Sequence, residues 1–317
     1  LAVSPWPADG AARAQMVICH GMAEHGARYA ALAEALNAQG ISVQALDLRG
    51  HGASTPELPR GVLAAGVDWS HLVDDVALLL KRTRAAHPNQ PIVLLGHSMG
   101  SYLAQSVLIE HSALVDVAIL SGSHAQPAAA SAAAGLVARI EGLLRGPQAP
   151  AKTLDRLSFA QYNRTFSPNR TAFDWLSRDQ QQVDRYVADP LCGFVLSCHY
   201  WRCLADALLV LYEGEAHEAG DLGRRTEAAL GLGQRLLDGQ VGIDDEVLLQ
   251  KDDFLVELAH AAFDHLLDDV LGLAGLACLV GEDRLLALDG RSVDVLGLEG
   301  QRVGRRDMHR HLARKGA

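Results

Sequence analysis

The feature that most constrains this chain is a short glycine-rich segment between an apolar stretch and an expected helix. Residues 92–95 are apolar, the next five residues follow the pattern G-x-S-x-G, and residues 101–109 carry apolar side chains at helical spacing. A strand, a sharp turn and a helix in this order lift a serine hydroxyl above the edge of a sheet. A side chain at Gly96 or Gly100 would collide with neighbouring backbone in so tight a turn. The pattern therefore predicts an α/β fold with Ser98 at a strand-to-helix turn.

A second segment, near the N-terminus, suits the same chemistry. Residues 16–19 form a short apolar stretch that leads into the sequence H-G-M-A-E-H-G-A-R-Y at residues 20–29. Acyl transfer by a serine needs preorganised N–H donors for the oxyanion. One donor comes from the residue after the serine, Met99, and the other from the loop after an early strand, where Met22 fits. We therefore expect Ser98 to be a nucleophile, with the N–H groups of Met22 and Met99 forming the oxyanion hole.

A third segment, D-L-R-G-H-G-A-S at residues 47–54, completes a recognisable set of motifs. In this order and spacing, the three segments resemble α/β-hydrolases of the monoglyceride lipase, lysophospholipase and serine aminopeptidase-like group. The resemblance extends over about residues 1–212. It implies a mostly parallel sheet flanked by helices, with a helical cap. It also implies hydrolysis of a small-molecule carboxylic ester, such as a monoacylglycerol or lysophospholipid, without a cofactor or a metal.

The same resemblance divides the chain into three parts. Residues 1–123 are expected to form the N-terminal half of the hydrolase core, residues 124–200 the cap, and residues 201–317 a C-terminal region of uncertain structure. The alanine-rich residues 128–144 predict one or two helices, either as walls of an acyl pocket or as ordinary packing. A cap of this kind would set the acyl chain-length preference and could make a transient contact with a lipid surface.

The C-terminal third differs in composition from the rest. None of the 11 prolines follows Pro190, and residues 213–317 hold 21 acidic against 12 basic side chains. Proline is common at loop turns, so its absence from a stretch this long is unusual for an α/β enzyme. Two readings stay open: an acidic helical extension, with helical spacing over residues 244–271, or a frame-shifted or fused translation that does not complete the fold.

The base and the acid that a serine nucleophile requires are harder to place. The hydroxyl needs an imidazole base, which needs a carboxylate to orient it, and this fold orders them serine, acid, histidine. His217 lies in a segment that resembles the family's histidine loop, and Asp283 in one that resembles its acid segment, but in reverse order. If Asp283 is the acid, His309 or His311 becomes the candidate base. Because His217 comes too early in the chain to leave room for the usual acid strand, weak or absent esterase activity is expected.

Other polar residues near these motifs suggest structural roles. His20 and His25 flank the oxyanion turn and are expected to shape the loop or contact substrate. His51 is expected to pack and hydrogen-bond below the site. Asp47 and Arg49 predict a structural ion pair rather than acid–base chemistry.

Composition excludes several classes of function. A net charge of −10 gives no reason to expect nucleic-acid binding, which calls for a basic face. The five cysteines read as reduced thiols, and Cys198 and Cys203 lack a second pair at zinc-ligand spacing, so no metal site is expected. The longest apolar run, residues 270–280, is too short to span a bilayer.

Location and activity class remain expectations. No signal peptide is visible in the sequence, so a cytoplasmic protein is expected unless a leader was removed. Residues 1–4 have the pattern of a strand entered partway. Two alternatives to an esterase stay open. One is an aminopeptidase-like hydrolase with an acidic recess for the substrate ammonium, and the other is an impaired hydrolase-like protein with a disrupted C-terminus.

Overall fold

The computed structural model describes residues 1–54, 57–123, 126–164 and 166–212, together with three strands between residues 277 and 297. Its centre is a five-stranded sheet in the order β1-β3-β2-β4-β5. The strands are β1 (Val3–Trp6), β2 (Ala14–Cys19), β3 (Ile41–Leu46), β4 (Ile92–His97) and β5 (Val117–Ser121). β1 runs antiparallel to β3, and the other neighbours are parallel. The mostly parallel sheet that the motifs predicted is confirmed.

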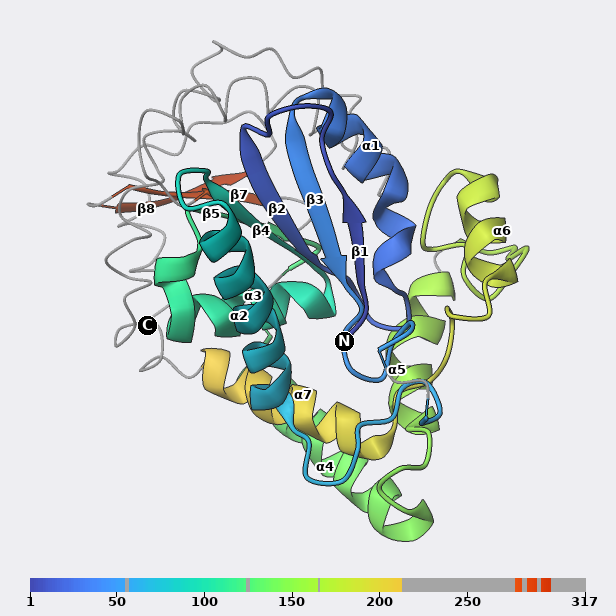
Figure 1. Cartoon of the computed structure of the whole chain (residues 1–317). Coiled ribbons are helices and arrows are strands. Elements are labelled where there is room, and N and C mark those ends of the chain that lie inside the picture. The colour runs from blue at the N-terminus through green and yellow to red at the C-terminus, as the bar shows by residue number, and fades with distance from the viewer. Residues whose placement is uncertain are drawn as a thin grey trace.

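Helices cover both faces of this sheet because its central strands bury apolar side chains on both sides (Figure 1). In β2, Met16 and Ile18 pack on the face covered by α1 (Ala30–Ala38), which follows the 3-10 helix η1 (Gly26–Tyr29). Val17 and Cys19 point the other way, into a second core. That core is closed by α2 (Trp69–Ala86) and α3 (Met99–His111), which leads into the 3-10 helix η2 (Ser112–Leu114). Near-continuous apolar strands are typical of parallel sheets buried on both faces.

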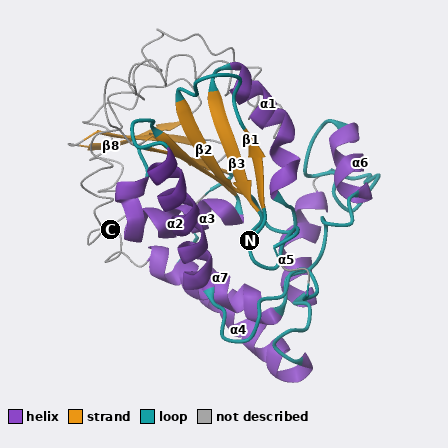
Figure 2. Ribbon diagram, viewed as in Figure 1, coloured by secondary structure: helices purple, strands orange, loops and turns teal. Residues whose placement is uncertain are grey.

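Four further helices follow β5, and we call them the cap. They are α4 (Ala128–Arg145), α5 (Lys152–Arg164), α6 (Gln180–Ala188) and α7 (Cys198–Tyr212). In the view of Figure 2, α4 and α7 lie below the sheet, and α6 lies to its right. α4 packs along α7 through a face of small residues that includes Ser131, Gly135 and Ala138. The alanine-rich segment is thus a single helix. α7 continues across residue 200, and the division expected there remains a prediction.

Beyond residue 212 the structure describes only β6 (Ala277–Val280), β7 (Arg284–Asp289) and β8 (Ser292–Gly297). These strands form an antiparallel sheet of their own in the order β6-β7-β8, distinct from the central sheet. The helix expected over residues 244–271 lies outside the described residues. Within the described helices, none combines the length and the hydropathy needed to cross a bilayer.

Candidate active site

Ser98 occupies a strained turn between β4 and α3. Its backbone has φ 51° and ψ −118°, and α3 begins at the next residue. A positive φ is uncommon for a residue with a side chain and persists only where the surroundings hold it. Here the Ser98 N–H donates to the carbonyl of Ser121 at 2.8 Å, and the Ser98 carbonyl accepts from the Ser101 N–H at 2.8 Å. The predicted strand-to-helix turn is confirmed, and strain is stored at the serine.

The two glycines of the motif are fixed by close backbone approach. A Cβ on Gly96 would lie 2.4 Å from the Gly100 carbonyl oxygen. A Cβ on Gly100 would lie 2.1 Å from the Cys19 carbonyl oxygen at the end of β2. Neither contact is sterically allowed, so only glycine lets α3 pack this close to β2 and β4. The spacing in the sequence therefore has a direct geometric cause.

The loop after β2 lies directly against Ser98. A Cβ on Gly21 would lie 3.4 Å from the Ser98 Cβ and 3.2 Å from the His97 Cδ2. Met22, the next residue, packs against the core that contains Met99. Two segments that are far apart in the sequence therefore meet at the serine, as the oxyanion-hole hypothesis requires.

A buried carboxylate holds this loop in shape. The Gly21 N–H donates to Glu24 Oε1 at 2.5 Å, and the Tyr29 hydroxyl donates to the same oxygen at 3.0 Å. Arg28 pairs with the other oxygen, Oε2. Burial alone would raise the pKa of Glu24, but the charge on Arg28 and the hydrogen bond from the Gly21 N–H lower that pKa to about 2. Glu24 is therefore ionised at neutral pH and acts as an acceptor for the turn.

Two buried histidines support the loop from below. His20 donates from Nδ1 to the Gly21 carbonyl at 2.7 Å and accepts at Nε2 from the Leu48 N–H at 3.0 Å. His51 accepts at Nε2 from the N–H of Ala23 at 3.2 Å. Burial lowers the pKa of both, to about 3 for His51. Both rings are therefore neutral hydrogen-bonding supports, which matches the role expected for His51.

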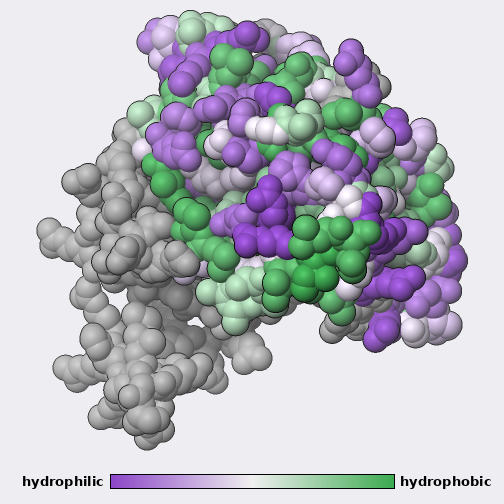
Figure 3. Space-filling view, turned by 90° about the horizontal axis from the view of Figure 1, so that it is seen from below, coloured by the Kyte–Doolittle hydropathy of each residue, from purple (hydrophilic) through white to green (hydrophobic). Residues whose placement is uncertain are grey.

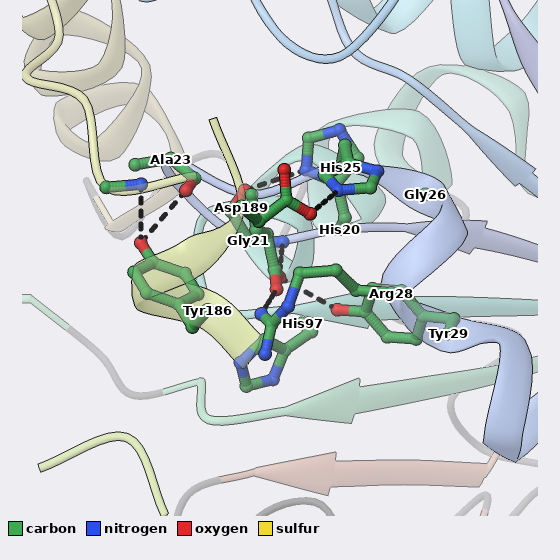
Figure 4. A network of polar contacts seen from close by, with 12 residues as sticks. His20, Gly21, Ala23, His25, Gly26, Arg28, Tyr29, His97, Tyr186 and Asp189 are labelled. Carbon is green, nitrogen blue, oxygen red and sulfur yellow. Dashed lines mark hydrogen bonds and ion pairs between the residues drawn. The ribbon is translucent and has the colours of Figure 1, made fainter. Parts of the chain in front are cut away.

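The cap fastens onto the same loop from the other side (Figure 4). The Tyr186 hydroxyl donates to the Ala23 carbonyl at 2.9 Å, and the Gly193 N–H donates to that carbonyl at 3.0 Å. His25 Nε2 lies 2.8 Å from Asp189 Oδ2. Ala23 has a φ of 56°, so the cap helps to hold a strained residue next to Met22. The sequence did not predict this attachment.

The structure does not place the residues expected to be the base and the acid of the triad. His217 and Asp283 lie outside the described residues, as do His309 and His311. Asp283 falls in sequence between β6 and β7. Within the part of the chain that is described, no imidazole forms a hydrogen bond with the Ser98 hydroxyl. Ser98, Met22 and Met99 are therefore brought together without a described base.

The expected ion pair between Asp47 and Arg49 is wrong. Arg49 instead forms a two-point ion pair with Asp75 of α2, at 2.6 and 2.8 Å. Asp47 accepts backbone N–H groups from Gly26 and Ala53. Proximity in the sequence suggested the pair, but in the folded chain Arg49 reaches α2, whereas the Asp47 carboxylate accepts from backbone N–H groups.

The comparisons with known proteins agree with this geometry. The family model described as "Serine aminopeptidase, S33" matches residues 10–216. The chain belongs to this family. Within it, the relatives place the chain among α/β-hydrolases of the monoacylglycerol lipase group, as the motifs predicted.

One such relative is a monoacylglycerol lipase of Mycolicibacterium smegmatis, 32% identical over 192 residues that make up 59% of each chain. Another is a monoglyceride lipase of Mus musculus, 31% identical over 188 residues, which are 59% of this chain and 54% of the mouse protein. The chain thus spans little more than half the length of these relatives.

Solved structures confirm the fold. A thermostable carboxyl esterase from Bacillus coagulans has a TM-score of 0.61 and 21% identity, over 68% of this chain and 70% of the esterase. A lipase in its open form has a TM-score of 0.63 and 21% identity, over 85% of this chain and 94% of the lipase. The chain therefore has the α/β-hydrolase fold.

Proposed function

We propose that this protein hydrolyses carboxylic esters with Ser98 as the nucleophile. The observation that carries the proposal is the strained turn at Ser98, set against the loop that bears Met22. A serine on such a turn is presented to a substrate carbonyl, and strained residues cluster at functional sites. Family membership points the same way.

In the proposed reaction, the Ser98 hydroxyl attacks the ester carbonyl. Its proton passes to an imidazole base, and the carbonyl oxygen becomes an oxyanion held by the N–H groups of Met22 and Met99. The base then protonates the leaving alcohol, and water releases the acyl group from Ser98 by the same route in reverse. His217 is the proposed base and Asp283 the proposed acid, on their resemblance to the family's segments.

The proposed substrate is a monoacylglycerol or lysophospholipid. The relatives named above include monoacylglycerol lipases, and a probable lysophospholipase L2 of Haemophilus influenzae is 31% identical over 36% of each chain. Such substrates carry one acyl chain and sit in membranes or micelles. An enzyme that acts on them benefits from an apolar surface near its site.

The cap offers such a surface. Figure 3 shows hydrophobic side chains gathered on the underside of the molecule, where Figure 1 places α4. Leu143 is 87% exposed and Leu144 79%, and Leu136 and Ile140 on the same helix are also exposed. Contiguous exposed apolar side chains mark interaction sites. We propose that this face of α4 rests transiently on a lipid surface.

A panel of substrates tests the proposed function. We expect hydrolysis of a monoacylglycerol and of p-nitrophenyl butyrate above the buffer rate, with loss of both in Ser98→Ala and retention in Ser158→Ala. Ser158 is a matched control because its hydroxyl bonds only within α5. Preference for aminoacyl nitroanilides over esters would instead favour an aminopeptidase. No turnover in a folded protein would favour an impaired hydrolase.

Two further experiments test the finer parts of the proposal. If His217 is the base, His217→Ala abolishes the ester hydrolysis. If this substitution is harmless, His309 and His311 are the next residues to replace.

If α4 contacts lipid, the double variant Leu143→Glu with Leu144→Glu binds less to phosphatidylcholine vesicles and keeps its activity on p-nitrophenyl butyrate. Unchanged vesicle binding would contradict the lipid contact.

A further inference from the structure

We propose that the junction between the cap and the oxyanion loop is a site for a divalent cation of the zinc class. Its ligands would be His25 Nε2, a carboxylate oxygen of Asp189 and Cys192 Sγ. These three atoms lie within 4.8 Å of one another. The inference does not depend on the role of Ser98.

Backbone hydrogen bonds fix the two segments that supply these ligands. Cys192 donates its N–H to the Asp189 carbonyl at 3.0 Å, and Leu191 donates its N–H to Asp189 Oδ1 at 2.8 Å, so the turn holds both ligands on one side. The bond from the Gly193 N–H to the Ala23 carbonyl, at 3.0 Å, anchors this turn beside His25. The ligands are therefore positioned before any ion arrives.

The set of donor atoms selects the metal. One imidazole nitrogen, one carboxylate oxygen and one thiolate sulfur with an open fourth position suit tetrahedral Zn²⁺, whereas Mg²⁺ and Ca²⁺ prefer oxygen ligands alone. The two anionic ligands balance the charge of the ion. His25 is buried, but Asp189 and Cys192 are partly exposed, so an ion can enter from solvent.

Binding requires only a small rearrangement. His25 Nε2 and Asp189 Oδ2 are 2.8 Å apart, and tetrahedral bonds of about 2.0 Å would separate them to about 3.3 Å. The ion would replace the hydrogen bond between them, and the imidazole would carry its hydrogen on Nδ1. The Cys192 thiol would lose its proton to solvent as the sulfur binds.

Spacing in the sequence does not reveal this site. Structural zinc ligands recur as closely spaced pairs, and Cys198 and Cys203 have no second pair. Here His25 and Asp189 are separated by 164 positions and meet only because the cap folds onto the loop.

Titration of the full chain with Co²⁺ tests the proposal directly. Co²⁺ substitutes for Zn²⁺ and gives visible tetrahedral bands and a near-ultraviolet thiolate charge-transfer band. We expect both in the unaltered protein, with displacement by Zn²⁺. Cys192→Ser should remove the thiolate band and weaken binding at least about tenfold. Cys203→Ser and Cys278→Ser, which alter cysteines outside the cluster, should leave the spectrum unchanged.

Thermal unfolding gives a second readout that does not need activity. Zn²⁺ in large excess over its Kd should raise the melting temperature of the unaltered protein and of Cys203→Ser by several degrees, because only the folded state offers the site. The rise should be smaller in Cys192→Ser and Asp189→Asn than in the unaltered protein. The proposal is overturned if the folded protein gives no thiolate band, or if the band persists in Cys192→Ser.

Discussion

The Tyr186 hydroxyl in the cap donates a hydrogen bond of 2.9 Å to the carbonyl of Ala23, one residue beyond Met22. The Gly193 N–H donates to the Tyr186 oxygen at 3.1 Å and to the same carbonyl at 3.0 Å. A single carbonyl in the oxyanion loop therefore receives two donors from the cap. Cap and loop form one hydrogen-bonded unit, and a disturbance of the cap reaches the proposed site.

Tyr186→Phe tests this coupling. In this variant the Ala23 carbonyl keeps one of its two hydrogen-bond donors, and the Gly193 N–H keeps one of its two acceptors. We expect a loss of about 1–2 kcal/mol in the free energy of unfolding and a severalfold fall in esterase rate. Urea unfolding and p-nitrophenyl butyrate hydrolysis measure the two effects. Tyr162→Phe, at a half-exposed position on α5, should change neither. Equal effects in both variants would contradict the coupling.

Gly21→Ala tests the contact between the loop and the serine. The new Cβ would lie 2.8 Å from Glu24 Oε1 and 3.4 Å from the Ser98 Cβ, so the loop must shift. We expect at least a tenfold fall in kcat, since one misplaced oxyanion donor costs about 10²–10³ in rate. Gly135→Ala is the control, because its Cβ would meet Ala205 at an ordinary 3.5 Å. Full activity in Gly21→Ala would argue against an oxyanion hole at this loop.

Glu24→Gln tests the buried carboxylate. Removal of its charge ends the ion pair with Arg28, and we expect a loss of about 2–3 kcal/mol in stability at pH 7. The pKa of Glu24 is lowered to about 2 in the folded state. Its contribution is therefore full above the unfolded value near 4.5 and is lost as the pH falls toward 2.

Urea midpoints at several pH values measure this effect. The difference between the unaltered protein and Glu24→Gln should shrink below pH 4.5. Glu34→Gln, at an exposed position on α1, should match the unaltered protein throughout. A difference that stays constant down to pH 3 would show that charge is not the cause.

His51→Gln tests the neutral histidine support. The pKa of His51 is lowered from 6.5 to about 3, so below pH 6.5 the unfolded chain takes up a proton that the folded chain does not. Its contribution to stability is therefore present above pH 6.5 and falls by up to about 1.4 kcal/mol per pH unit below it. His51→Gln should flatten the fall between pH 6.5 and 4.5. His87→Gln, at the end of α2, should leave it unchanged; if it flattens the fall equally, the assignment to His51 is wrong.

Much of the site could be predicted from local spacing. The turn at Ser98 and the loop at Met22 each follow a short apolar strand. Gly96 is required by backbone approach within its own motif, and Gly100 by approach to Cys19 at the end of β2. Two short motifs carry that information. The same holds for the mostly parallel sheet, whose strands are apolar on both faces.

The attachment of the cap could not be predicted in this way. Tyr186 and Ala23 are 163 positions apart, and their hydrogen bond involves a carbonyl, which has no sequence signature. Arg49 illustrates the same limit. Its nearest acidic residue in the sequence, Asp47, is not its partner in the structure. Side-chain pairing depends on which elements pack together. The pairing of Arg49 with Asp75 could be predicted only from the position of α2 in the fold.

Peptide mapping after treatment with a fluorophosphonate tests the role of Ser98 most directly. An activated serine displaces fluoride and keeps the phosphonyl group, which mass spectrometry locates to one residue. We predict that the group is found on Ser98, that it is absent in Ser98→Ala, and that Ser158→Ala is labelled like the unaltered protein. Labelling of another serine, or no labelling of a protein shown to be folded, would contradict the assignment of Ser98 as the nucleophile.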